Sequence, residues 1–130
     1  MAALGLFTLP KKERLCNRKE IDRLFDGANR SLSAYPLRVV YTLVPREHDG
    51  VVARMMVSVP KRCFKRAVKR NRVKRQIREA YRHHKQILAE KVSQDMALAI
   101  AFIWLADELH DSQQVNRSVK RLLEKVAESV

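Results

Sequence analysis

The sequence predicts a fold of the α+β class, in which a small mixed sheet of three or four strands carries helices packed on it. The chain has 130 residues, of which 46% are hydrophobic, and this suits one modest core. Segments with apolar residues at helical spacing are interspersed with shorter, strand-like apolar segments. Their order is helix, strand, strand, helix, strand, helix, with room for one more strand. We expect residues 1–130 to form a single domain in which residues 1–12 are flexible.

The first predicted helix follows Asn17. Asn17 and Glu20 have the spacing of the N-cap residue and the third helical residue in a capping box. Gly27 suits the left-handed conformation in which many helices end. Three apolar residues share one face of this helix, namely Ile21, Leu24 and Phe25.

Two strands are predicted next, over residues 37–44 and 51–59. The turn-forming residues His48, Asp49 and Gly50 separate them, so residues 37–59 predict a β-hairpin. Proline cannot donate a hydrogen bond to a sheet, so the second strand should end before Pro60. In the first strand the apolar residues on one side are Leu37, Val39, Tyr41 and Leu43.

The second half of the chain predicts a helix, a strand and a helix. Apolar residues recur at helical spacing over residues 66–92, which indicates one long helix. Residues 96–104 are continuously apolar, as expected of a strand covered on both faces. Asp111 and Gln114 have capping-box spacing, so the last helix should begin after Asp111. Its predicted buried stripe comprises Val115, Val119, Leu122, Leu123 and Val126.

The positive charge of the chain is concentrated in one segment. The formal net charge is +13, with 27 basic and 14 acidic residues. Residues 61–85 hold 12 of the basic residues and only one acidic residue, Glu79, so this segment accounts for nearly all of the excess. Such an excess predicts a polyanionic partner, which is usually a nucleic acid.

The spacing of these charges is specific. Basic residues recur at every fourth position, which on a helix forms a column along one side. Like charges stacked in this way destabilise an isolated helix by about 0.2–0.5 kcal/mol per pair, and phosphates would offset the repulsion. A surface helix that serves only solubility would carry interspersed acids. The column comprises Arg62, Arg66, Arg70, Lys74, Arg78 and Arg82.

Catalytic and metal-binding patterns are weak. Cys16 and Cys63 lack the spacing of a metal site or a redox pair, which indicates reduced thiols. No apolar segment reaches the length needed to span a membrane, and the N-terminal residues do not predict a signal peptide. The best candidate nuclease cluster is Asp107, Glu108, His110 and Asp111, but Asp111 is better explained as a helix cap. We therefore expect no catalytic residue and no metal site in this chain.

The segment from Ser58 to Arg82 resembles the signature of the bacterial ribonuclease P protein family. In that family a strand leads through a basic loop into a helix with an Arg-Asn-Arg motif, which here is Arg70-Asn71-Arg72. The resemblance extends over essentially the whole chain and includes Glu13-Arg14-Leu15. It implies a fold similar to a ribosomal-protein domain, with a left-handed crossover from strand to helix to strand.

The resemblance also implies the function. The chain would be the protein subunit of ribonuclease P, an endoribonuclease whose RNA subunit uses Mg²⁺ to remove the 5′ leader of precursor tRNA. The expected partners are the ribonuclease P RNA, with one protein copy per RNA, and precursor tRNA, in the cytoplasm and without a membrane. Contacts to the catalytic RNA are expected from Lys61, Arg62, Lys65, Arg66, Lys69, Arg70, Asn71, Arg72, Lys74, Arg75 and Arg78.

A second RNA surface is implied between the first helix and the sheet, where family members bind the single-stranded leader. The matching positions are Ile21, Phe25 and Tyr41. Ile21 departs from the aromatic residue that is usual in the family and cannot stack on a base as a ring does. For Phe25 and Tyr41, packing in the core is an alternative of similar weight.

Other classes of function remain as alternatives. A ribosomal or ribosomal-RNA assembly protein could use the same basic helix without a leader cleft. A basic-helix DNA-binding protein would need a dimerising heptad run, which residues 86–95 do not sustain. An RNA-recognition motif is disfavoured because no strand carries its aromatic signature. A peripheral membrane protein would need an inserting apolar face, whereas the apolar face of the basic helix is short and is needed for the core.

Overall fold

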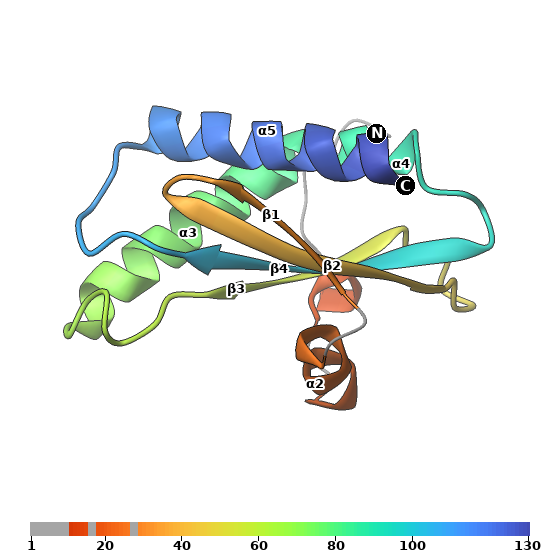
Figure 1. Ribbon diagram of the computed structural model, residues 1–130, viewed down its shortest axis with the longest axis horizontal. Coiled ribbons are helices and arrows are strands. Elements are labelled where there is room, and N and C mark those ends of the chain that lie inside the picture. Colours follow the sequence, from red (N-terminus) through yellow and green to blue (C-terminus); the bar gives the residue numbers. More distant parts are fainter. Residues whose placement is uncertain (1–10, 16–17, 27–28) are drawn as a thin grey trace.

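The computed structural model describes residues 11–15, 18–26 and 29–130. These residues form a mixed sheet with helices on both faces (Figure 1). The elements in chain order are η1 (Lys11–Glu13), α2 (Arg18–Phe25), β1 (Arg30–Ala34), β2 (Leu37–Pro45), β3 (Ala53–Ser58), α3 (Ala67–His84), α4 (Gln86–Ala89), β4 (Met96–Trp104) and α5 (Ser112–Ser129).

The four strands lie in the order β1-β2-β4-β3. β2 pairs antiparallel with both β1 and β4, whereas β3 pairs parallel with β4. The parallel neighbours are joined through α3 and α4, which forms the predicted strand–helix–strand unit. α3, α4 and α5 lie over one face of the sheet, and α2 lies under the other (Figure 1).

The continuous apolar run is confirmed as a strand with the expected bounds, because β4 spans Met96–Trp104. Its neighbours on both sides and the helices on both faces explain why no polar alternation is needed. The last helix begins directly after Asp111, whose side chain accepts a hydrogen bond from the Gln114 backbone nitrogen at 2.8 Å. The first helix is also confirmed as α2, while Asn17 and Gly27 lie outside the described residues.

The predicted hairpin over residues 37–59 is wrong. β2 and β3 do not pair, because β4 lies between them. The most apolar strand takes the central position, where both of its edges and both of its faces are covered. β2 instead forms a hairpin with β1, a strand that the sequence pattern did not place because its residues, RSLSA, offer little apolar alternation.

The single long helix predicted over residues 66–92 is also wrong, since the structure divides it into α3 and α4 at Lys85. Apolar burial continues beyond the break, through Leu88 and Val92. Helical spacing of apolar residues reports which side is buried, and it does not report whether the backbone hydrogen bonds are continuous.

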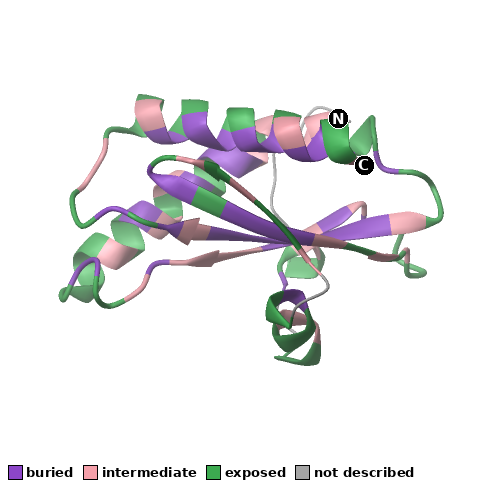
Figure 2. Cartoon of the chain, viewed as in Figure 1, coloured by how far each residue is buried: buried purple, intermediate pink, exposed green. Residues whose placement is uncertain are grey.

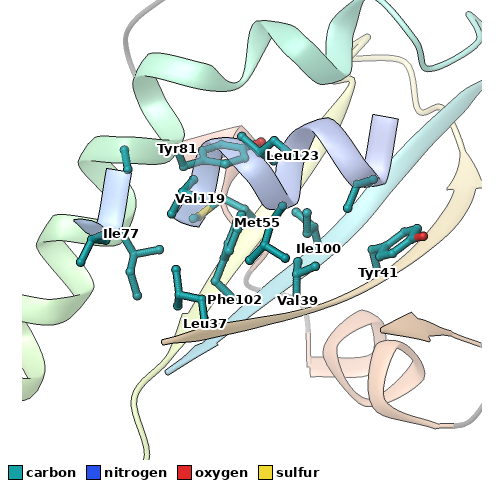
Figure 3. Packing of buried hydrophobic residues seen from close by; sticks show 14 of the residues in the cluster. Leu37, Val39, Tyr41, Met55, Ile77, Tyr81, Ile100, Phe102, Val119 and Leu123 are labelled. Carbon is teal, nitrogen blue, oxygen red and sulfur yellow. The ribbon is translucent and has the colours of Figure 1, made fainter. Parts of the chain in front are cut away.

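The main core fills the space between the sheet, α3 and α5 (Figure 3). Ile77 and Tyr81 from α3 belong to this core with Phe102 from β4, and the Tyr81 and Phe102 rings make an edge-to-face contact with centroids 5.9 Å apart. Burial raises the pKa of Tyr81. This underside fixes the orientation of α3 relative to the sheet.

A smaller cluster lies under the opposite face of the sheet. Leu24 of α2 and Leu15 pack against three strand residues, with Ile21 at the margin. Two of those strand residues are alanines, whose short side chains allow α2 to approach the backbone of β4 closely. The strand residues are Val40, Ala99 and Ala101.

We predict that Ile77→Ala destabilises the protein far more than Val68→Ala on the same helix. Ile77 is fully buried, so its truncation leaves a cavity and should lower the free energy of unfolding by about 2–5 kcal/mol. Val68 is 79% exposed, and its truncation should change that energy by less than about 0.5 kcal/mol. Urea unfolding of the two variants provides the comparison, and equal midpoints would contradict the assigned orientation of α3.

Candidate RNA interface

Helix α3 turns its basic side outward because its apolar side is committed to the core. Val73, Ile77, Ala80 and Tyr81 are buried, while most of the residues between them are exposed (Figure 2). No acidic residue lies in the first turn of α3, so the amide groups there add to the positive field. The outward side is therefore a rigid cationic surface.

The structure brings the predicted contacts to the catalytic RNA together on the loop before α3 and on α3 itself. Nine of them are exposed, and Arg70 and Lys74 are partly buried. We call this set the basic ridge. Its exposed members are Lys61, Arg62, Lys65, Arg66, Lys69, Asn71, Arg72, Arg75 and Arg78.

Arg70 has a structural role that the charge pattern did not indicate. Its Nη1 donates hydrogen bonds to the backbone oxygens of Phe64 and Lys65, at 2.7 and 2.9 Å. These bonds fix the basic loop against the first turn of α3. No sequence signal distinguished Arg70 from Arg72, because the role depends on how the loop folds back.

A groove runs along one flank of the ridge. It is lined by Arg14 from the N-terminal segment and by five residues of α3, and we call it the arginine groove. Glu79, its only acid, bonds Arg82 and also His83 at 3.0 Å. The hydrogen bond from Arg82 holds the pKa of Glu79 below its usual value. The α3 residues are Asn71, Arg75, Arg78, Glu79 and Arg82.

A second groove lies beside α2, on the opposite face of the sheet, and we call it the α2 groove. Its floor includes Thr42 and Val44 of β2 and Ala99 of β4, and Glu20 and Arg23 of α2 form one side. The remaining lining residues are Leu15, Pro45, Arg46, Glu47, Arg54 and Leu98. Its apolar residues can pack against flat, uncharged groups, and the arginines at its rim can bind anionic groups of the same extended chain.

The structure does not bring all three predicted cleft residues together. Ile21 and Phe25 both lie on α2, where Ile21 packs against the smaller cluster and Phe25 is 45% exposed, and neither of them lines the α2 groove. Tyr41 is only 3% exposed and points into the main core on the other face (Figure 3). Its hydroxyl group is hydrogen bonded to Ser129 Oγ at 2.6 Å. The alternation of β2 was predicted correctly, but the sequence did not reveal which side faces α2.

The α2 groove is bordered by an ion-pair cluster. Arg54 Nη2 lies 2.5 Å from Asp49 Oδ2 and 3.2 Å from Glu47 Oε2. The pKa of Asp49 is lowered, mainly because the Val51 backbone nitrogen donates a hydrogen bond to its carboxylate. The two carboxylates therefore fix the orientation of the Arg54 guanidinium group.

Two members of the candidate nuclease cluster, His110 and Asp111, have structural roles, and Glu108 lies 3.8 Å from His110 Nε2. Asp111 caps α5, and His110 Nδ1 is hydrogen bonded to Gln114 Oε1 at 2.8 Å. His84 bonds Asn116, whereas His83 bonds Glu79, so the two adjacent histidines point to different neighbours. Within residues 11–15, 18–26 and 29–130, no group of three or more His, Cys, Asp or Glu side chains is arranged to hold a metal ion.

No helix among the described residues is long and apolar enough to cross a membrane.

A family model described as Ribonuclease P matches residues 9–127. Ribonuclease P protein components from two strains of Porphyromonas gingivalis are 44% and 46% identical to the chain, over 100% of it and 94% of their own length.

Solved structures have the same fold. The Staphylococcus aureus RNase P protein has a TM-score of 0.66 and 22% identity, and the match covers 88% of this chain and 94% of that one. The RNase P protein from Thermotoga maritima has a TM-score of 0.65 and 23% identity, with 87% and 96% covered. At these identities the likeness concerns the fold alone.

We predict that Arg70→Ala lowers stability while Arg72→Ala does not. Loss of the two bonds to the loop carbonyls should lower the free energy of unfolding by about 1–2 kcal/mol, because these bonds involve a charged donor. Arg72 is exposed, and its truncation should cost less than about 0.5 kcal/mol. Urea unfolding compares the two variants, and equal stability would show that Arg70 does not hold the loop.

Proposed function

The chain belongs to the ribonuclease P protein family, and from this we propose that its basic ridge docks on the catalytic RNA while its α2 groove holds the 5′ leader of precursor tRNA. The family supplies the protein subunit of an endoribonuclease that forms the mature 5′ end of tRNA. The chain acts as that subunit and is not catalytic by itself. A ribosomal or assembly role is not favoured.

The docking proposal is supported by the exposed cations of α3, a helix whose apolar side is buried in the core. Among the described residues, no hydrogen bond or ion pair within the protein engages the side chains of Arg72, Arg75 or Arg78. An RNA backbone would release its counterions on binding them, and the release favours association. The arginine fork also suits two oxygens of one phosphate.

We extend this role to the whole basic ridge, with different tasks for its members. Arg72, Arg75 and Arg78 would contact phosphates directly. Arg70 would present the loop from Lys61 to Arg66 in a fixed conformation while its remaining donors face RNA. Recognition of this kind reads the shape of a folded RNA more than its base sequence.

For the leader we propose contacts from Thr42 and Val44 of β2, which line the α2 groove, and from Ile21 and Phe25, which lie on α2 outside that lining. Thr42 and Val44 replace Tyr41, because they face the α2 groove and Tyr41 faces the core. An exposed aromatic ring offers a stacking surface for an unpaired base, and the arginines at the rim suit its phosphates. Positioning the substrate in this way would accelerate cleavage without any catalytic side chain.

We further propose that the Mg²⁺ ions used in the reaction are bound by the RNA subunit, since a surface crowded with arginines repels divalent cations. We also propose one protein copy per RNA, because each protein copy presents one basic ridge for docking. The cytoplasm is the compartment in which bacterial precursor tRNA is made, so we place the activity there.

Docking on the catalytic RNA can be tested with single arginine substitutions on α3. Arg75→Ala and Arg78→Ala should each weaken binding to the ribonuclease P RNA and reduce the salt dependence of log K by about one, if one phosphate contact is lost. Lys120→Ala on the exposed side of α5 removes the same charge away from the ridge and should leave the slope unchanged. Filter binding over a salt series measures both, and an equal effect of all three variants would refute a localised interface.

Leader binding can be tested at the exposed aromatic ring of α2. Phe25→Ala should weaken binding of precursor tRNA to the holoenzyme by about 5- to 100-fold, as expected for one lost stacking contact, and should leave mature tRNA unaffected. Tyr35→Ala is the control, because Tyr35 is an aromatic residue that is 62% exposed in the turn between β1 and β2. Equal losses for precursor and mature tRNA would show that α2 does not contact the leader.

A further inference from the structure

The arginine groove and the surface around α2 meet at one side chain, Arg14. Arg14 lines the arginine groove together with α3. It also lines a second hollow together with Lys11, Lys12, Arg54 and three acids, namely Glu20, Glu47 and Asp49. Glu20 and Arg54 belong both to this hollow and to the α2 groove. The two proposed RNA surfaces are therefore connected across the outer edge of β3, and Arg14 lies at the connection.

The backbone around Arg14 is fixed. Arg14 forms an isolated parallel bridge with Met55 of β3, and the Leu15 backbone nitrogen donates to the Met55 oxygen at 2.8 Å. On the other side, Glu13 receives both of its carboxylate contacts from Lys85 Nζ, at 3.0 and 3.2 Å. This ion pair is largely buried and ties the segment to the end of α3. The position of Arg14 thus does not depend on bound RNA.

The side chain of Arg14 is exposed and, within the part of the chain that the structure describes, is engaged by no hydrogen bond or ion pair. The two guanidinium groups on either side of it differ in this respect. Arg82 is held by Glu79, and Arg54 is held by Asp49 and Glu47. The protein therefore pairs Arg82 and Arg54 with its own acids and leaves the charge of Arg14, like those of Arg75 and Arg78, available to an anion.

We propose that Arg14 binds a backbone phosphate of the precursor tRNA leader, at the point where the leader passes from the catalytic RNA to the α2 groove. The inference rests on the proposed function, because it uses the basic ridge as the docking surface and the α2 groove as the leader site. The hollow lined by Arg14 offers a strand that leaves RNA held on α3 a path across the edge of β3 into the α2 groove. A guanidinium is suited to bind a phosphate there in a fixed register.

The test compares three affinities of the assembled holoenzyme and its parts. Arg14→Ala should weaken binding of precursor tRNA by about 3- to 10-fold and lower its salt slope by about one, as for one lost phosphate contact. Affinity for mature tRNA and for the ribonuclease P RNA alone should stay within about twofold, the usual effect of an exposed substitution. Arg14→Lys keeps the charge and should retain most of the salt slope. Lys12→Ala is the neighbouring control and should have a smaller effect on precursor binding.

The phosphate that Arg14 contacts can be located by replacing single leader phosphates with uncharged methylphosphonates. Single methylphosphonate substitutions along the leader should weaken binding to the wild-type holoenzyme at one position, and at that position they should have no further effect with Arg14→Ala. Additive losses at every position would overturn the proposal. An equal loss of ribonuclease P RNA binding by Arg14→Ala would also overturn it, since the phosphate would then belong to the RNA subunit.

The outcome separates this inference from the function it rests on. If Phe25→Ala loses precursor selectivity and Arg14→Ala does not, the leader site along α2 stands and the Arg14 contact is refuted. If neither variant is selective, the leader site along α2 is itself refuted. Urea unfolding of Arg14→Ala should match the wild type because the side chain is exposed, so that loss of fold does not account for a loss of binding.

Discussion

The fixed attachment of α3 to the sheet is the constraint on which the rest of the molecule depends. Cations at successive turns of one helix repel one another, and an isolated helix with this sequence would be destabilised. Burial of Ile77, Tyr81 and their neighbours offsets the repulsion and sets which side of the helix faces outward. RNA phosphates can then approach charges that are already in place, without the entropic cost of ordering the helix.

The cationic segment is also held in place at the edge of β3. The Glu13–Lys85 pair, the bridge at Met55 and the Arg70 contacts to its loop all join the cationic segment to the rest of the fold. None of them would be found by counting charges, because each depends on a backbone arrangement of residues distant in sequence. They give the surface a defined geometry, which a flexible basic tail would lack. A fixed geometry can hold two RNA molecules in one relative orientation.

The fold could be predicted from the sequence wherever a segment carried a strong local signal. The continuous apolar run predicted β4, the Asp111 cap predicted the start of α5, and the apolar stripe with Ile77 and Tyr81 predicted the buried side of α3. The fourfold charge column did not mark the outward side, because Arg70, Lys74 and Arg82 are partly buried. Strand order could not be predicted, since alternation in β2 and β3 says nothing about which neighbour each one pairs with. β1 has too few apolar residues to be noticed. Tyr41 shows the same limit at the candidate site. The alternation of the strand showed which residues share a side with Tyr41, but it did not show which side of the sheet faces α2.

The most direct measurement is cleavage of precursor tRNA by the ribonuclease P RNA at limiting Mg²⁺, with and without the purified protein. If the cationic helix offsets repulsion between the two RNA molecules, adding the protein restores cleavage at Mg²⁺ concentrations where the RNA alone is inactive, and high monovalent salt abolishes the restoration. Cleavage that is unchanged by the protein at every Mg²⁺ concentration would contradict this account.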